Sequence, residues 1–385
     1  MTTLDAAAVW KDSKRYWWLL SPMVPPLVAW SLWNFVTSGH GSWLWGALLL
    51  IYVIIPLLDV LIGTDTSNPP EDATARLETE RYYRFIVALY TPTQFATVAF
   101  GAWIVATQPM VWWEYLALVI AIGVVSGIGI NTAHELGHKN VAWERWLAKL
   151  TLAPVAYGHF FVEHNRGHHI RVATPEDPAS ARLGESFWAF LPRTMVGSLV
   201  SAWQLEKERL NRAGKSVWSW RNDNLQAWAM TVVFFGGLTI WLGPIVLPFL
   251  LLQAFYGASL LEVVNYIEHY GLLRQKDPKT GRYVRCQPEH SWNSNHIVTN
   301  LFLYQLQRHS DHHANAMRRF QALRHFDESP QLPSGYASML VLAYVPPLWR
   351  WVMDKRVLAH YEGDVTKANL QPSQRAKYLT RYAAA

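Results

Sequence analysis

The sequence predicts an all-helical integral membrane protein with six transmembrane helices and a helical cytoplasmic cap. Hydrophobic residues make up 51% of the 385 residues. The mean hydropathy is nevertheless only +0.03, so the apolar residues must be concentrated in blocks beside a large polar part. Six blocks approach the length of about 20 apolar residues that a membrane span needs. The 21 tryptophans suit the aromatic belts at the two surfaces of a bilayer.

The predicted spans cover residues 16–36, 43–61, 85–106, 115–130, 225–242 and 245–266. A polar loop over 63–84 separates the second span from the third, and Gly243-Pro244 makes the turn between the fifth and the sixth. A further apolar piece, Met339 to Trp351, contains two prolines. We expect it to be interfacial or packed rather than spanning.

These spans divide the chain into five parts. They are a cytoplasmic N-terminus (1–15), spans one to four (16–130), a cytoplasmic histidine region (131–224), spans five and six (225–268), and a second cytoplasmic histidine region with the C-terminal tail (269–385).

The basic residues orient the predicted helices. The three connections on one side, 37–42, 107–113 and 243–244, contain no Lys or Arg, so all 34 basic residues fall on the other side. The positive-inside rule makes that side cytoplasmic. Both termini and every clustered histidine are therefore expected there.

The remaining composition excludes several protein classes. The single cysteine, Cys286, excludes a disulfide framework and a thiolate-ligated iron–sulfur cluster. The net charge of +6 is accounted for by the membrane topology. Because the sequence contains no nucleic-acid-binding motif, we expect no nucleic-acid partner.

Nine of the 15 histidines form four groups beside the inner ends of the predicted spans. They are His134 and His138 in NTAHELGHK, His164, His168 and His169 in EHNRGHH, His269 in NYIEHYGLLR, and His309, His312 and His313 in LQRHSDHHA. Spacings of three and four return side chains to one helical face. His134/His138, His164/His168 and His309/His313 are therefore expected to be chelating pairs. Nine imidazoles exceed what one metal accepts, so two metals are predicted, and imidazole suits iron, copper, zinc or nickel.

Two other readings of the histidines are weaker. His134 to His138 also matches HExxH, the zinc protease signature, in which Glu135 would activate water. That reading leaves the seven other clustered histidines unexplained. A di-haem cytochrome needs histidines inside the spans, and no predicted span interior contains one.

Polar neighbours of the histidines are candidates for orienting the ligands. Metal-bound histidines usually donate their second N–H to a carboxylate or a carbonyl. The candidates are Glu135, Glu163, Asn265, Glu268 and Asp311.

With these motifs, the chain resembles the integral-membrane alkane 1-monooxygenases, the bacterial alkane ω-hydroxylases of the membrane di-iron fatty acid desaturase/hydroxylase superfamily. The resemblance covers nearly the whole length. Besides the four histidine blocks, it includes PLLDVLIG, the NPPE loop and SWNSNHIVTN. Desaturases share the general histidine plan, so another di-iron enzyme acting on fatty acyl chains, as a hydroxylase or a desaturase, stays an alternative.

The resemblance implies the cofactor, the reaction and the partners. The nine histidines would bind two iron ions of a non-haem di-iron centre. The enzyme would insert one atom of O2 into the terminal C–H bond of a medium-chain alkane and yield a 1-alkanol and water. Electrons would come from rubredoxin, reduced by an NADH-dependent reductase, and the enzyme would lie in the bacterial inner membrane. Lys139, Arg145, Arg318 and Arg319 are candidates for docking the acidic rubredoxin.

An alkane dissolved in the bilayer would enter the helix bundle from the side. Candidates for the channel wall are Ile51 and Leu58 on the second span and the small Gly127 on the fourth. For Gly127, ordinary close packing of helices is an equally good explanation.

Overall fold

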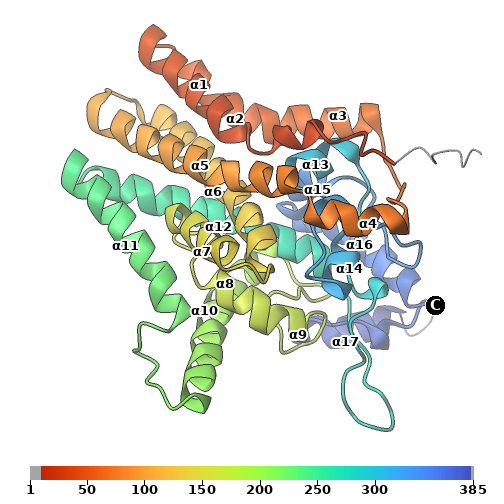
Figure 1. Cartoon of the computed structure of the whole chain (residues 1–385). Coiled ribbons are helices and arrows are strands. Elements are labelled where there is room, and N and C mark those ends of the chain that lie inside the picture. Colours follow the sequence, from red (N-terminus) through yellow and green to blue (C-terminus); the bar gives the residue numbers. More distant parts are fainter. Residues whose placement is uncertain (1–9, 383–385) are drawn as a thin grey trace, which may run out of the picture.

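The computed structural model describes residues 10–382, and within that range the chain is helical apart from loops and four isolated β-bridges (Figure 1). Five helices in this range are long and apolar enough to cross a membrane. They are Gly41–Ile62, α5 (Arg81–Thr107), α6 (Trp112–Gly137), α11 (Asp223–Leu242) and α12 (Val246–His269). The all-helical prediction is confirmed, together with five of the six predicted spans.

The first predicted span is not one long helix. A 3-10 turn, Trp17–Leu20, precedes α1 (Val24–Ser38), which has 15 residues. Proline lacks the backbone N–H and restricts the residue before it, so Pro22 and Pro25 allow a helix to begin here but not to continue through. At 1.5 Å per residue α1 is about 22 Å long, less than the bilayer core of about 30 Å.

The second span contains a local widening. It consists of Gly41–Trp45, α2 (Gly46–Leu49), a π-helical turn over Leu50–Ile54 and α3 (Ile55–Ile62). A π turn adds a residue to one helical turn, so it changes which side chains share a face.

Helices α6 and α12 form the centre of the bundle and touch through their backbones. A Cβ added at Gly257 would lie 2.9 Å from the carbonyl oxygen of Gly123, and one at Gly127 would lie 3.0 Å from the carbonyl oxygen of Gly257. Small residues permit such close approach of membrane helices. Both helices continue beyond their predicted spans, to Gly137 and His269, so each carries histidines on its inner end.

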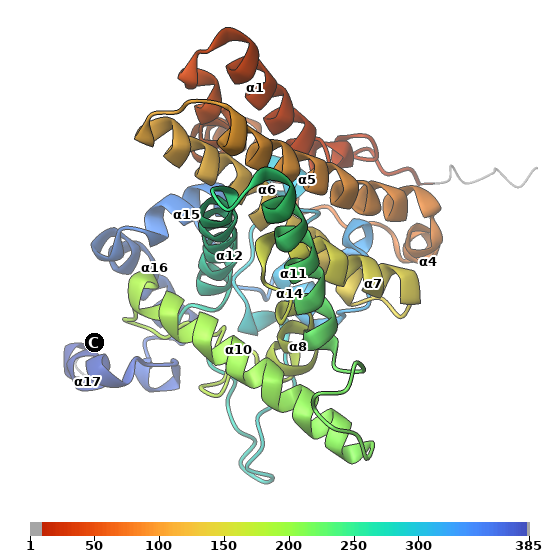
Figure 2. The same cartoon turned by 90° about the vertical axis from the view of Figure 1, so that its left-hand side faces the viewer.

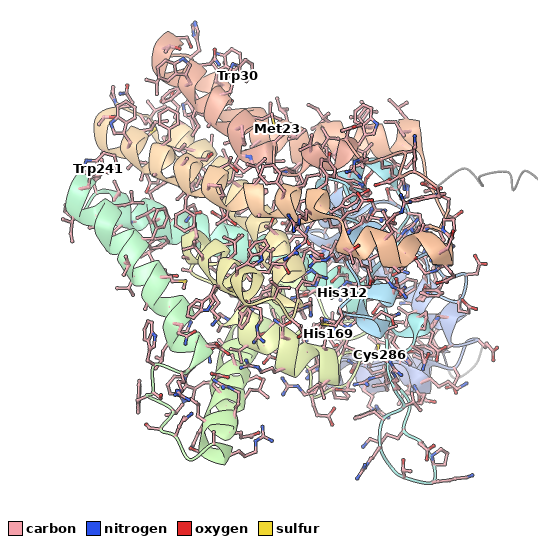
Figure 3. The ribbon with its side chains drawn as sticks, viewed as in Figure 1. Met23, Trp30, His169, Trp241, Cys286 and His312 are labelled. Carbon is pink, nitrogen blue, oxygen red and sulfur yellow. The ribbon has the colours of Figure 1, made fainter. Side chains whose placement is uncertain are left out.

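The other helices form the cap around these inner ends. They are α4 (Glu71–Thr79), α7 (Ala142–Thr151), α8 (Phe160–Glu163), α9 (His169–Arg171), α10 (Phe187–Arg212), α13 (Ile297–Phe302), α14 (His309–Ala314), α15 (Tyr336–Ala343), α16 (Pro346–His360) and α17 (Arg375–Tyr382). Short 3-10 turns cover Ala153–Val155, Pro288–His290, Phe320–Ala322, Val365–Lys367 and Pro372–Gln374. Figure 3 shows Trp30 and Trp241 toward one end of the molecule and His169 and His312 toward the other.

Candidate metal centre

The nine clustered histidines come together in two neighbouring groups. The five-histidine group contains His134, His138, His164, His169 and His312, and the four-histidine group contains His168, His269, His309 and His313. Within each group, one ring nitrogen of every histidine lies within 4.8 Å of the others. The rings of His169 and His313, one from each group, have centroids 4.4 Å apart. The two groups therefore form one bipartite site.

The spacing of the nitrogens fits a shared metal. The Nε2 atom of His312 lies 2.8 Å from that of His134 and 3.1 Å from that of His169. In the other group, the Nε2 atom of His309 lies 2.8 Å from that of His313 and 3.3 Å from that of His269. Two nitrogens bound about 2.1 Å from one metal are about 3.0 to 3.4 Å apart at the usual ligand angles. The distances are thus close to those of adjacent ligands.

Burial keeps these imidazoles in the form that binds metal. Removal from water lowers the pKa of the six clustered histidines outside the spans well below the ordinary value of about 6.5. They are His138, His164, His169, His309, His312 and His313. The Nε2 atoms of His138 and His168 are buried and have no hydrogen-bond partner within residues 10–382. Both lone pairs are therefore available to a cation.

The second histidine block is distributed between the groups by a π-helical turn. The turn covers His164–His168, and its i to i+5 pattern places His164 and His169 on one side, with Nε2 atoms 3.1 Å apart. His168 points into the four-histidine group. The prediction that His164 and His168 chelate one metal as a pair is wrong, because it assumed 3.6 residues per turn.

The other two predicted pairs stay together. His134 and His138 both enter the five-histidine group, and His309 and His313 both enter the four-histidine group. His312, on the same short helix α14 as His309 and His313, faces the first group instead.

One carboxylate that orients a histidine was not predicted. Asp177 Oδ2 lies 2.9 Å from Nδ1 of His168, and both side chains are buried. Burial alone would raise the pKa of Asp177, but attraction to His168 and hydrogen bonds from His168 and Ser180 hold it at about 2. The ionised carboxylate accepts the Nδ1 proton and leaves Nε2 free for a metal. In the sequence, the only indication of this contact is the polar segment EDPAS (176–180), in which Asp177 follows His168 by nine positions.

Of the predicted polar neighbours, Glu268 contacts a clustered histidine directly, with Oε2 3.1 Å from Nε2 of His309. The side-chain amide of Asn265 donates a hydrogen bond to Glu262 at 3.2 Å. Both residues line a small cavity that His164 and His168 also line.

The other three carboxylates pair with basic groups instead. Glu135 pairs with Lys139 at 3.1 Å, Glu163 with Arg171 at 2.7 Å and Asp311 with Arg318 at 2.6 Å. Successive helical residues are turned by about 100°, so a carboxylate next to a histidine in sequence faces elsewhere. The ion pair with Lys139 also counts against Glu135 as the water-activating base of a zinc protease.

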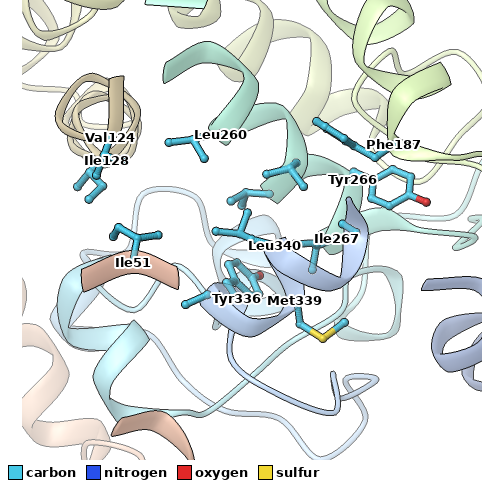
Figure 4. Packing of buried hydrophobic residues seen from close by; sticks show 14 of the residues in the cluster. Ile51, Val124, Ile128, Phe187, Leu260, Tyr266, Ile267, Tyr336, Met339 and Leu340 are labelled. Carbon is cyan, nitrogen blue, oxygen red and sulfur yellow. The ribbon is translucent and has the colours of Figure 1, made fainter. Parts of the chain in front are cut away.

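An apolar cavity lies among the buried hydrophobic side chains of the inner bundle, several of which Figure 4 shows. The centre of a water-sized sphere can move through about 70 Å³ of it, so the cavity is narrow beside the range of about 300–1,000 Å³ for small-molecule sites. Ile51, Val124, Leu260 and Leu340 face this space from four different helical segments. Asn131, which also lines it, precedes His134 by one helical turn.

Two of the predicted channel residues line this cavity. Ile51 does so, and so does Gly127, which also packs against α12. Leu58 does not line it and lies half-buried against the core. The next residue, Asp59, is the one that points inward. It accepts hydrogen bonds from the backbone N–H of Thr299 at 2.9 Å and from the hydroxyl of Thr299 at 2.5 Å.

Comparison with known proteins agrees with this geometry. Residues 110–343 match the family described as fatty acid desaturase. The alkane 1-monooxygenase of Acinetobacter baylyi is 48% identical over 96% of this chain and 91% of its own length, and that of Ectopseudomonas oleovorans is 47% identical over 98% and 94%. The xylene/toluene monooxygenase hydroxylase component of Pseudomonas putida is 26% identical over 91% of this chain and 90% of its own length.

These matches extend over the membrane helices, both histidine groups and the apolar cavity. The chain therefore belongs to the alkane 1-monooxygenases, within the fatty acid desaturase family.

Proposed function

We propose that this enzyme hydroxylates the terminal methyl group of medium-chain n-alkanes to 1-alkanols, using O2 and two iron ions held by the nine histidines. The observation that carries the proposal is the apolar cavity whose wall includes Asn131, one helical turn before His134, because a substrate without polar groups can be held only by shape and exclusion of water. The curated relatives with this name support the same substrate class.

The proposed iron ligands are the five-histidine group for one ion and the four-histidine group for the other. When bound, two Fe(II) ions supply the electrons and open coordination positions that O2 activation requires. Asp177 holds His168 in the tautomer that presents Nε2, and Glu268 lies against His309. Sulfur ligands are absent from both groups, which is compatible with iron bound by imidazole alone.

The cavity walls determine how the substrate lies. Val124, Ile128 and Leu260 offer an alkane no hydrogen-bonding partner, so it is held by shape alone, against the faces of α6 and α12 that line the cavity. One end then lies near Asn131, one turn from His134. The walls exclude water from the reacting end, which protects an oxidising site from side reactions.

We further propose that the chain crosses the bacterial inner membrane six times, with both termini and the metal centre on the cytoplasmic side. Support comes from the segment before α1. Lys14 pairs with Asp65 at 2.6 Å, beyond the inner end of the second span, whereas α1 ends at Ser38 beside the start of that span at Gly41. The segment from Trp17 to Ser38 therefore extends from the inner end to the outer end of the second span, Gly41–Ile62 (Figure 1).

Rubredoxin, reduced by an NADH-dependent reductase, is the proposed electron donor. The lone cysteine cannot hold an iron–sulfur centre, and the net charge of +6 favours an acidic partner. Three suggested docking residues have other contacts: Lys139 is buried against Glu135, Arg318 pairs with Asp311 and Arg319 pairs with Glu144. Of those four candidates, Arg145 alone has no carboxylate partner among the ion pairs of residues 10–382.

The test is to supply octane through dodecane to the iron-loaded enzyme with rubredoxin, its reductase and NADH, and to analyse the products. We expect 1-alkanols, and none from a His309→Ala variant with the same fold. Hydroxylated or desaturated fatty acids without alkanols would instead support an enzyme of fatty acyl chains.

A further inference from the structure

A groove between α16 and α17 carries four basic side chains, and both helices follow the last histidine block in the sequence. Arg350 and Lys355 line it from α16, and Lys377 and Arg381 line it from α17. Its volume of about 1,080 Å³ includes its open mouth. Lys377 and Arg381 are exposed, so the groove is accessible from outside the protein.

The positive charge of this groove is not balanced by the protein. The ion pairs within residues 10–382 use other Lys and Arg side chains, and these four take part in none of them. The one carboxylate of the groove, Asp354, is 5% exposed. It accepts hydrogen bonds from Tyr270 at 2.8 Å and Tyr378 at 2.5 Å, so its oxygens face the floor. An anion in the groove would meet four cations, none of which forms an ion pair within residues 10–382.

The groove continues into an exposed apolar surface. Helix α15 packs against the membrane-spanning segment Gly41–Ile62, and in the turn after it the backbone carbonyl of Tyr344 accepts a hydrogen bond from the indole N–H of Trp188 at 3.1 Å. From this turn, the exposed side chains are apolar: Val341 (45%), Val345 (42%), Leu348 (51%) and Trp351 (71%). Trp351 also lines the groove, so the apolar surface and the cations meet there.

The position of the groove distinguishes it from a surface beneath the metal centre. Figure 2 shows α16 and α17 at the lateral edge of the molecule, whereas α14, which carries three of the histidines, lies near its middle. Because both helices belong to the cap at the inner ends of the spans, a lateral position there beside apolar side chains corresponds to the headgroup level on the cytoplasmic side. A soluble electron donor would instead approach the cytoplasmic face.

We propose that this groove binds the phosphate headgroup of an anionic phospholipid, with the acyl chains against Val345, Leu348 and Trp351. Basic pockets beside membrane helices on the cytoplasmic side bind such headgroups, and each Lys or Arg near the headgroup contributes about 1 kcal/mol. The aromatic ring of Trp351 lies at the level where headgroup and acyl chain join, and Lys355 Nζ is 4.9 Å from its centroid.

The experiment compares lipid binding by two charge-matched variants of the full-length enzyme. Lys377→Gln with Arg381→Gln removes two cations of the groove. Lys276→Gln with Lys279→Gln removes two cations from an exposed loop, so both variants have the same net charge. Binding of phosphatidylglycerol and of phosphatidylcholine with identical acyl chains is measured by native mass spectrometry of delipidated protein. We expect about 30-fold weaker phosphatidylglycerol binding for the groove variant alone, with phosphatidylcholine unchanged.

Four results would overturn the proposal. Equal loss of both lipids would indicate a general effect on the apolar surface, and equal phosphatidylglycerol binding by both variants would show that the cations are not used. Unchanged lipid binding with weaker rubredoxin-driven turnover would identify a protein-docking surface instead. Inorganic phosphate is tested alone as a further arm, because displacement of phosphatidylglycerol by millimolar phosphate would assign the groove to a soluble anion.

Discussion

The carboxylate of Asp177 and the imidazole of His168 form a buried pair, with Oδ2 and Nδ1 2.9 Å apart. This contact connects a loop to the π-helical turn that carries His164 and His168, directly before His169 of α9. It determines which nitrogen of His168 is free to face the four-histidine group.

The Asp177 contact predicts the effect of removing its charge. In Asp177→Asn, an amide replaces the ionised acceptor, and metal affinity should fall about 10- to 100-fold because His168 is less well oriented. Equilibrium dialysis against iron measures this directly. Asp327→Asn, the same change at a fully exposed side chain, is the control. Equal affinities for the two variants would contradict an orienting role for Asp177.

Replacing His312 and replacing His313, which are adjacent on α14, should have different effects on metal content. His312→Ala leaves four ligands in its group, whereas His313→Ala leaves three in the other. We expect about two metal ions per chain for the first variant and about one for the second, measured by elemental analysis of purified protein. Identical losses would mean that the two groups do not act as separate sites.

The metal-free protein should lose stability in acid. The pKa values of six buried histidines lie well below the ordinary 6.5, so they stay neutral in the folded state while the unfolded chain takes up protons. Unfolding is therefore favoured as the pH falls below about 6.5, by about 1.4 kcal/mol per pH unit for each such histidine.

Thermal denaturation in detergent measures this effect. The midpoint temperature should decrease as the pH is lowered from about 7 to about 5. Replacement of the exposed His40 by Gln should not alter the profile. A midpoint that stays constant over this range would contradict the neutral state of the cluster.

Ile51 should limit the length of the substrate. A Trp side chain in Ile51→Trp would fill part of the cavity, and turnover of the longest accepted alkane should fall about tenfold or more, with short alkanes less affected. Leu58→Trp is the matched control, because this residue lies on the same span outside the cavity wall. Chain-length profiles from alkane mixtures provide the measurement, and an unchanged profile for Ile51→Trp would remove it from the channel.

Electron delivery should depend on salt. If an acidic rubredoxin docks on a basic face, its turnover should decrease as salt rises from about 0.05 M to about 0.5 M, because the screening length shortens from more than 10 Å to a few Å. Turnover driven by hydrogen peroxide needs no docking and should not change. Parallel losses in both assays would indicate an effect of salt on the enzyme itself.

Much of this protein was readable from its sequence. Apolar blocks of membrane length and the absence of Lys and Arg from three connections predicted the helical bundle. The spacing of His134 from His138 and of His309 from His313 predicted shared metal groups, since these residues follow ordinary helical periodicity. These features depend on residues close together in the chain, so local patterns were sufficient.

Only the tertiary structure decided how nine histidines divide into groups of five and four. A π turn moves His169 rather than His168 beside His164, and no spacing rule for ordinary helices anticipates that. Asp177 and Asp59 likewise gain their contacts from distant segments, as Asp59 does with Thr299. Sequence determines which groups are available, but their partners depend on how distant helices pack.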